Sequence, residues 1–327
     1  MLEFSFTTAK VNFRVKTRDK YCFISGFSGE GKSLFIAELE NYINFGAGEL
    51  RSNKEVHLVK TRDDLARMDH YIQTEESPVF VADEIVAHKV LRNIKDKKAY
   101  AILVTRHLFR DFNFSYRCLF VAKRDTDGVT RIHRKVRLLN KPKVKEFQLI
   151  ITEDTAAGYE FIRQIVPSVN VVGCGGKDKI YERFRRVSDV DAVLLICDGG
   201  GVGTVINKLR KISKQLERNG IKCRILMPEC FEHVLLNSGF VEFSNDVLAE
   251  FKLSYNNTET FCENKLKELT AGRPFEFDHD KQSLSKCWII ECQECKERCE
   301  YYTDKLKKEF VLENGPCVRL LDLGKEV

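Results

Sequence analysis

The 327-residue sequence lacks long apolar runs. It contains no window of about 18 consecutive apolar residues, the least that a membrane-spanning helix needs. Its first residues, MLEFSFTTAKVNFRVK, alternate between apolar and polar as a β-strand does, and they lack the apolar centre of a signal peptide. Hydrophobic residues make up 43% and charged residues 31% of the chain. The sequence therefore predicts a soluble, cytoplasmic protein with no membrane partner.

The chain also lacks a strong excess of charge of one sign. Its formal net charge of +6 is compatible with a DNA or RNA partner but does not demonstrate one. The 12 cysteines fit a cytoplasmic protein if they are reduced or bound to metal, because disulfides rarely persist there. A chain of 327 residues is long enough for two ordinary domains.

One short motif carries the clearest chemistry. A strand-like run, YCFIS, enters the segment GFSGEGKS at residues 26–33, which satisfies G-x-x-x-x-G-K-[ST] at every fixed position. Gly26, Gly29 and Gly31 let backbone N–H groups turn inward and form an anion site at a helix N-terminus. Lys32 would reach the β and γ phosphates of a nucleotide, and the Ser33 hydroxyl would hold Mg²⁺.

The surroundings of this P-loop fit the motif. Apolar residues recur at helical spacing after it, until two glycines stop the pattern near residue 46. Strand, loop and helix thus occur in the required order, which argues against the alternative of a chance match on a surface turn.

An acidic pair follows the next buried strand, as a P-loop requires. The run Val79-Phe80-Val81-Ala82 ends in Asp83 and Glu84. In this arrangement Asp83 would contact the metal shell and Glu84 would polarise the attacking water. The alternative is that the two carboxylates only cap the next helix.

A further buried strand, residues 101–104, ends in Thr105, Arg106 and His107. These side chains would sense the γ-phosphate or contact a neighbouring subunit, which would make the protein a homo-oligomer. The alternative is ordinary polarity at the end of a strand.

The remaining elements predict an α/β domain over residues 1–145, with a hairpin whose turn is Asp127-Gly128. This domain resembles a compact P-loop ATPase core with a parallel sheet. It lacks the LSGGQ-like signature and the helical subdomain of ABC transporter and repair ATPases. It also lacks an N-K-x-D guanine-reading motif, so the expected nucleotide is ATP.

A second α/β domain is expected over residues 146–252. Strands at residues 147–152, 169–172, 192–197 and 223–227 alternate with helices at residues 156–165, 179–187 and 205–218. Such alternation predicts a parallel sheet whose ligand sites lie at the carboxyl ends of the strands. Acidic residues occur at those ends, notably Glu153, Asp198, Glu229 and Glu232.

The order LIITED, VVGCGGKDKI, AVLLICDGGGVG resembles the Toprim fold of topoisomerases, primases and the overcoming-lysogenisation-defect nucleases. The resemblance covers about 85 residues. It implies a catalytic Mg²⁺ site in which Glu153 matches the Glu of the first strand and Asp198 the first Asp of an Asp-x-Asp. Gly200 stands where the second Asp is expected. The site would then hold its metal weakly, recruit Glu229 or Glu232, or have no catalytic activity; alternatively, the acids only cap helices.

Two glycine clusters, at residues 173–176 and 199–203, follow strands but do not match G-x-G-x-x-G. They are typical of tight turns, and a second nucleotide site is the weaker alternative. Lys177 and Lys179 could contact nucleic-acid phosphates.

Residues 253–327 form a Cys-rich C-terminal region. Cys287, Cys292, Cys295 and Cys299 fall within 13 residues and could bind Zn²⁺ or an iron–sulfur cluster, with Cys317 as a reserve ligand. The alternative is that three of them lie on the buried face of a helix.

Together these patterns predict an ATP-binding and hydrolysing protein whose nucleotide state controls a Toprim-like domain acting on nucleic acid. Such pairings resemble mobile-element and phage-defence proteins. The main alternative is a nucleotide-gated binding or scaffold protein with a non-catalytic Toprim-like domain. A P-loop kinase is a third reading, against which stands the absence of a lid segment with closely spaced arginines.

Overall fold

The computed structural model describes residues 1–106, 112, 114–138, 146–166, 168–237, 250, 258–272, 275–277, 288–290 and 317–320. The described chain divides into two compact units. Unit 1 contains Met1–Val136, and unit 2 contains the described residues from Arg137 onward. Unit 2 therefore also includes the described residues between 258 and 320. Our sequence analysis assigned these residues to a separate, Cys-rich C-terminal region.

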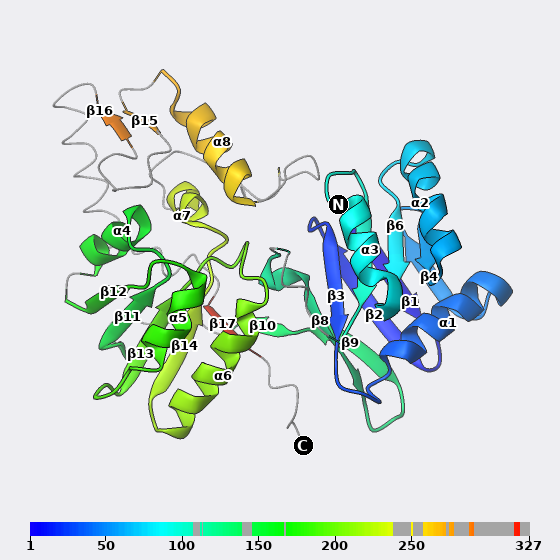
Figure 1. The fold of residues 1–327 in the computed structure, drawn as a ribbon, viewed down its shortest axis with the longest axis horizontal. Helices are drawn as coiled ribbons and strands as arrows, with labels where there is room; N and C mark the ends of the chain where they lie inside the picture. Colours follow the sequence, from blue (N-terminus) through cyan, green and yellow to red (C-terminus); the bar gives the residue numbers. More distant parts are fainter. Residues whose placement is uncertain are drawn as a thin grey trace. The chain divides into compact units, whose positions relative to one another are not determined.

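The described residues of unit 1 form a nine-stranded sheet with the order β4-β1-β2-β9-β8-β3-β7-β6-β5 (Figure 1). The strands are β1 (Leu2–Thr7), β2 (Val11–Thr17), β3 (Tyr21–Ser25), β4 (Glu49–Ser52), β5 (Val56–Val59), β6 (Val79–Ala82), β7 (Tyr100–Val104), β8 (Leu119–Arg124) and β9 (Thr130–Arg134). The helices are α1 (Lys32–Phe45), α2 (Arg62–Thr74) and α3 (Glu84–Ile94), with a 3₁₀ turn at Tyr116–Cys118.

This sheet is mixed. Strands β8, β3, β7, β6 and β5 run parallel, as we expected of the core. Antiparallel pairs join β1 to β2, β1 to β4, and β8 to β9. The β8–β9 hairpin, with Gly128 at φ +80° in its turn, confirms the predicted hairpin. The alternating residues at the start of the sequence form β1 and β2, whereas our sequence analysis did not predict β4 or its pairing with β1.

Helix α1 packs into the core of unit 1 through Phe35, Ile36 and Leu39, all buried. The ring of Phe35 lies edge-on to Phe6 of β1 and Phe13 of β2, with ring centroids 6.0 and 5.8 Å apart. The same cluster includes residues of β3, β6 and β7. Helix α1, whose first residue is Lys32, is thus held between the antiparallel strands and the parallel core.

The main sheet of unit 2 has the order β10-β17-β14-β13-β11-β12. Its strands are β10 (Val136–Leu138), β11 (Leu149–Thr152), β12 (Asn170–Gly173), β13 (Ala192–Ile196), β14 (Lys222–Leu226) and β17 (Cys317–Leu320). The helices are α4 (Ala157–Ile165), α5 (Lys177–Phe184), α6 (Val205–Arg218), α7 (Phe231–Asn237) and α8 (Thr258–Thr270), and a small ladder pairs β15 (Phe275–Phe277) with β16 (Trp288–Ile290).

The four strands from β11 to β14 are parallel, which confirms the predicted alternation of strands and helices. Strand β11 lies between β12 and β13, so the chain turns to one side after β11 and to the other after β12. The crevice at such a switch point is the usual ligand site of an open α/β sheet. Thr152 and Ile196 are paired across it, which brings the residues that follow β11 and β13 together.

Within the part of the chain that is described, no helix is long and apolar enough to cross a membrane.

Candidate functional sites

The loop between β3 and α1 has the backbone conformation that only glycine adopts easily. Gly29 and Gly31 have φ values of +89° and +92°. A Cβ atom on Gly31 would lie 2.0 Å from Oγ1 of Thr130, and one on Gly26 would lie 2.9 Å from the carbonyl oxygen of Ala122. The loop backbone therefore lies directly against β8 and β9, and side chains at these positions would push it away.

Lys32 is 7% exposed and is the first residue of α1. Its Nζ donates hydrogen bonds to the carbonyl oxygens of Gly26 and Phe27, at 2.7 and 2.9 Å. Burial lowers its pKa, and the nearby carboxylate of Glu84 partly offsets that effect. The ammonium group thus folds back over its own loop, where anion oxygens would replace the two carbonyls.

The predicted acidic pair follows β6, two strands from β3, and β7 lies between them. Asp83 is the N-cap of α3, and its Oδ1 accepts a hydrogen bond from the N–H of Glu84 at 2.7 Å. The capping alternative is therefore confirmed for Asp83, and a role in holding metal stays a prediction. Only one oxygen of Asp83 is used by this cap.

Glu84 is paired with Arg106. The Nε of Arg106 lies 3.2 Å from Oε2 of Glu84, and the backbone N–H of Arg106 donates to Oε1 at 3.3 Å. Thr105, 3% exposed, directly follows β7, and its N–H donates to the carbonyl oxygen of Ile24 in β3. The structure thus brings Thr105 and Arg106 to the edge of the sheet that carries the loop of residues 26–33 and the acidic pair. His107 lies outside the described residues.

The residues of unit 1 fit a nucleotide with Mg²⁺. The loop of residues 26–33 is a cradle that Cβ atoms at Gly26 and Gly31 would fill, and the first turn of α1 carries no acidic residue that would repel phosphate. The hydroxyl of Ser33, which is exposed, and the free oxygen of Asp83 are the hard ligands that Mg²⁺ prefers.

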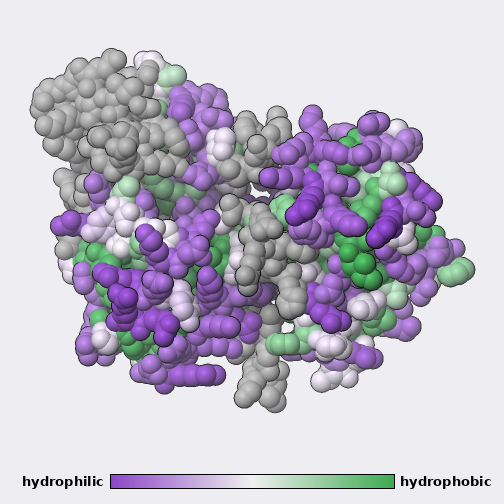
Figure 2. Space-filling view, in the orientation of Figure 1, coloured by the Kyte–Doolittle hydropathy of each residue, from purple (hydrophilic) through white to green (hydrophobic). Residues whose placement is uncertain are grey.

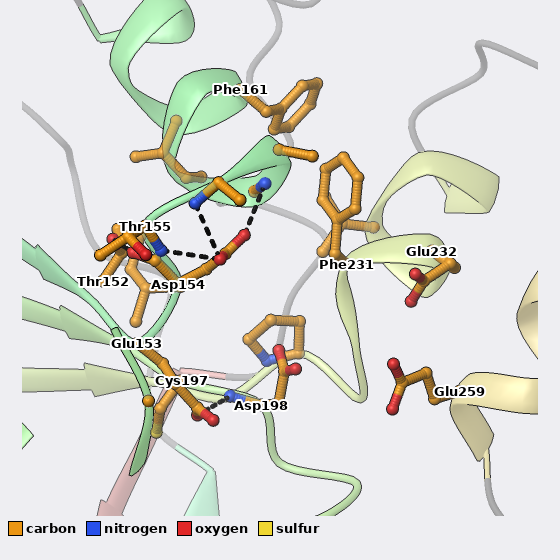
Figure 3. A pocket seen from close by; sticks show the side chains of 18 of the residues that line it. Thr152, Glu153, Asp154, Thr155, Phe161, Cys197, Asp198, Phe231, Glu232 and Glu259 are labelled. Carbon is orange, nitrogen blue, oxygen red and sulfur yellow. Dashed lines mark hydrogen bonds between the residues drawn. The ribbon is translucent and has the colours of Figure 1, made fainter. Parts of the chain in front are cut away.

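Unit 2 contains a pocket of about 370 Å³ at the carboxyl ends of β11 and β13 (Figure 3). Five of the described residues that line it are acidic: Glu153, Asp154, Asp198, Glu232 and Glu259. The other side is largely apolar, and the rings of Phe161 and Phe231 meet there with centroids 5.6 Å apart at 67°. A cavity is therefore present at the carboxyl ends of the strands, where we expected a ligand site.

The two predicted site residues, Glu153 and Asp198, lie together. The backbone N–H of Asp198 donates to Oε2 of Glu153 at 3.1 Å. Burial raises the pKa of Glu153, while Lys177 partly offsets this. The pKa of Asp198 is raised well above its usual value, first by burial and then by repulsion from Glu153, Glu232 and Glu259.

Asp154 has a structural part in the pocket. Its carboxylate accepts hydrogen bonds from the N–H groups of Thr155, Ala156 and Gly158, at 2.7 to 2.9 Å. It therefore fixes the first turn of α4, as the helix-capping alternative predicted for an acid at this place.

Gly200, where the Toprim resemblance would place a second Asp, packs against the loop after β14. Its N–H donates to the carbonyl oxygen of Glu229 at 2.9 Å, and a Cβ atom there would lie 2.6 Å from that oxygen. The same Cβ atom would be 3.2 Å from Oε2 of Glu229, whose side chain is 3% exposed. The space that a side chain would need at residue 200 is thus already taken by Glu229.

The Mg²⁺ site that the Toprim resemblance implies does not fit this arrangement. Within the described part of the chain, no group of three or more His, Cys, Asp or Glu residues is arranged to hold a metal ion. Glu229, a predicted replacement ligand, is not among the described residues that line the pocket. Glu232, the other predicted replacement ligand, does line the pocket, and it belongs to helix α7, whereas Glu153 and Asp198 follow strands of the sheet.

The glycine clusters of unit 2 form turns. Gly175 and Gly176, with φ values of +75° and +118°, precede α5, and the ammonium group of Lys177 donates to the carbonyl oxygen of Gly201. Lys177 is therefore directed at the second glycine cluster, and the exposed Lys179 remains the candidate for a phosphate contact.

Cys287, Cys292, Cys295 and Cys299 lie outside the described residues, so the predicted Zn²⁺ or iron–sulfur site stays a prediction. Our sequence analysis missed Glu259, because α8 lies in the segment that we assigned to a separate region. It also missed the Phe161–Phe231 pair, which no motif marks.

Neither comparison with known proteins gives a match: no protein-family model matches the chain, and no curated protein is similar enough to count.

Proposed function

We propose that this protein binds and hydrolyses ATP in unit 1 and that its nucleotide state controls nucleic-acid binding by unit 2. The observation that carries the first half is the convergence at one sheet edge of the loop of residues 26–33, the acidic pair after β6 and the polar residues after β7. Ser33 and Asp83 would hold Mg²⁺, which would neutralise phosphate charge.

Within this proposal Lys32 exchanges its two carbonyl partners for phosphate oxygens, which accept charge-assisted hydrogen bonds. Glu84 would orient the attacking water once its carboxylate leaves Arg106, and Arg106 would then be available for the γ-phosphate. Thr105, fixed beside β3, would contact the same phosphate.

A basic helix face in unit 2 supports nucleic acid as the partner. Helices α5 and α6 pack side by side, and hydrophilic residues cover them in Figure 2. The exposed basic residues on and just after these helices are Lys179, Arg183, Arg185, Arg186, Lys208, Lys211 and Arg218. Clustered Lys and Arg residues neutralise backbone phosphates, which is the main source of affinity for nucleic acid of any sequence.

Of the two roles that we considered for unit 2, the geometry favours binding without cleavage. A Toprim-like cleavage site needs carboxylates that share Mg²⁺, and Gly200 has no room for the missing one. The acidic pocket would repel phosphate, so the nucleic acid would lie along α5 and α6 instead of entering the pocket.

The test measures phosphate release from ATP by the wild type and the Lys32→Ala and Glu84→Gln variants, with and without DNA or RNA, on samples that are also run on a gel. We expect Lys32→Ala to lose ATP binding, and Glu84→Gln to bind ATP but hydrolyse it at least 100-fold more slowly, the scale on which acid–base groups act. Full turnover by Lys32→Ala would refute the ATPase proposal. Mg²⁺-dependent cleavage that disappears in Glu153→Ala would instead establish a nuclease.

A further inference from the structure

The hydroxyl group of Thr130, the first residue of β9, is buried without a hydrogen-bond partner among the described residues. The residue is 0% exposed, and its backbone N–H donates to the carbonyl oxygen of Lys10 at 2.7 Å. A buried hydroxyl that makes no hydrogen bond destabilises a fold, whereas valine has the same shape and no polar atom to satisfy. The hydroxyl of Thr130 is therefore a candidate for a hydrogen bond that forms in another state of the protein.

The side chain of Thr130 faces the loop of residues 26–33. A Cβ atom built on Gly31 would lie 2.0 Å from Oγ1 of Thr130, 2.7 Å from its Cγ2 and 2.9 Å from its Cβ. The hydroxyl oxygen is the nearest of the three atoms, so the polar side of Thr130, and not its methyl group, is directed at Gly31. Any side chain at residue 31 would meet it, and the φ of +92° at Gly31 also favours glycine.

A second contact ties the loop to the same pair of strands. Arg124 of β8 lies opposite Thr130 of β9 in the antiparallel register. The N–H of Arg124 donates to Oε2 of Glu30 at 3.1 Å. Glu30 and Gly31 therefore contact two residues that face each other in the β8–β9 hairpin, and the peptide group between Glu30 and Gly31 is held beside that hairpin.

This peptide group can take more than one orientation. The carbonyl oxygen of Gly31 already accepts from the N–H of Phe35 in α1, at 3.0 Å, which fixes the peptide on the other side of Gly31. Rotation of the Glu30–Gly31 peptide changes the ψ of Glu30 and the φ of Gly31, and glycine adopts positive and negative φ about equally well. The carbonyl oxygen and the N–H of a trans peptide point in opposite directions, so an orientation that turns the Glu30 carbonyl toward Thr130 turns the Gly31 N–H away from it.

We propose that Thr130 positions the loop of residues 26–33: when a nucleotide binds, the Thr130 hydroxyl donates to the carbonyl oxygen of Glu30, and the N–H of Gly31 turns toward the phosphate. The inference rests on the proposed nucleotide site of unit 1 and adds to it a residue outside the P-loop motif. N–H groups at a helix N-terminus bind anions, and a hydroxyl behind the peptide satisfies its carbonyl oxygen while the N–H contacts the phosphate. Thr130 thus acts through Gly31 and touches no substrate.

A hydrogen bond that forms only with bound nucleotide has a signature that a packing role lacks. In Thr130→Val the nucleotide-free fold loses an unpaired polar atom, so its Tm stays the same or rises, by at most about 3 °C. The nucleotide-bound state loses a hydrogen bond, so the affinity for ADP falls about fivefold, within the range of a single hydrogen bond. Thr130→Ser keeps the hydroxyl and binds ADP within about twofold of the wild type.

The experiment is isothermal titration calorimetry of the full chain, freed of nucleotide, with ADP and Mg²⁺, together with thermal melts without nucleotide. The matched control is Thr17→Val, at the end of β2 that lies away from Thr130. The hydroxyl of Thr17 already has partners, because it donates to Oδ2 of Asp19 at 3.0 Å and accepts from the N–H of Asp19 at 2.9 Å. Thr17→Val should therefore lower the Tm by about 3 °C and leave the affinity for ADP unchanged.

A lower affinity for ADP with an unchanged or raised Tm in Thr130→Val, and rescue of the affinity in Thr130→Ser, would support the proposal. Wild-type affinity in Thr130→Val would overturn it, and so would an equal loss in Thr130→Ser, which would assign the effect to shape. If Thr130→Val does not fold, Thr130→Ala, which also lacks the hydroxyl, gives the same comparison. A wild type that binds no nucleotide would refute the proposed function itself, whereas wild-type binding that Thr130→Val leaves unchanged would refute this inference alone.

Discussion

The substitution Gly200→Ala tests most directly how the loops beside the pocket of unit 2 pack against each other. In Gly200→Ala the new methyl group starts 2.6 Å from the carbonyl oxygen of Glu229, a backbone atom that cannot turn away as a side chain can. Overpacking of this kind costs about 1 to 3 kcal/mol. Separating the two loops also weakens the hydrogen bond from Gly200 N–H to the same oxygen, which costs about 1 kcal/mol.

Alanine offsets part of this cost, because it restricts the unfolded chain by about 0.4 to 1 kcal/mol. The net expectation for Gly200→Ala is a loss of about 1 to 3 kcal/mol in the free energy of unfolding of unit 2. For a domain of this size that is a fall of about 3 to 10 °C in Tm. Differential scanning calorimetry of the full chain measures it in the transition assigned to unit 2.

The neighbouring glycine provides a matched control. A Cβ atom on Gly201 would meet only the Nζ of Lys177, at 2.8 Å, and the flexible end of a lysine side chain can move away. Gly201→Ala should therefore change the Tm of unit 2 by less than about 2 °C. If the two alanine variants were equally stable, the packing argument would be refuted. Gly200→Asp should be at least as unstable as Gly200→Ala, and a stable Gly200→Asp with new Mg²⁺-dependent cleavage would contradict our account of the pocket.

Two further predictions concern charged groups. Arg106→Ala removes the partner of Glu84 and, in our proposal, a ligand of the γ-phosphate. We therefore expect the affinity for ADP to be unchanged, whereas the preference for a non-hydrolysable ATP analogue over ADP falls about tenfold in a competition assay. An unchanged preference would assign Arg106 a structural role only. Because the folded state raises the pKa of Asp198, it binds more protons than the unfolded state, and the stability of unit 2 should fall as the pH rises from about 4 through the raised value. Asp198→Asn should flatten that decline in urea titrations from pH 4 to 8, and a decline as steep as that of the wild type would show that other groups cause it.

The sequence predicted best those features of the backbone that depend on residues close together in the chain. Gly26, Gly29 and Gly31 have positive φ values, the conformation for which glycine was expected at these positions, and α6 spans Val205–Arg218 as predicted. The parallel strands of both units were predicted because buried runs alternate with helical periodicity. The antiparallel strands beside α1 were harder to place, since the partners of β1 are fixed by packing against Phe35 and not by a local signal.

The sequence predicted least where a site depends on residues that are distant in the chain. Glu153 and Asp198 could be paired because parallel strands end at one edge of a sheet. Glu259 could not, because it is over 100 residues from Glu153 and belongs to a helix whose pattern says nothing of what it packs against. The aromatic pair was hidden for the same reason, since Phe161 and Phe231 belong to different helices.

Gly200 illustrates the limit of reading a departure from a family pattern. In the sequence it is a missing carboxylate, and three consequences follow equally well: weak metal binding, a substitute ligand, or loss of catalysis. In the fold it is a backbone contact between the loops after β13 and β14, where any side chain would meet the carbonyl oxygen of Glu229. The glycine is thus required by the packing of this pocket, and a carboxylate at residue 200 could be restored only if the β14 loop moved. That coupling is why the Mg²⁺ site that the Toprim resemblance implies does not fit this pocket.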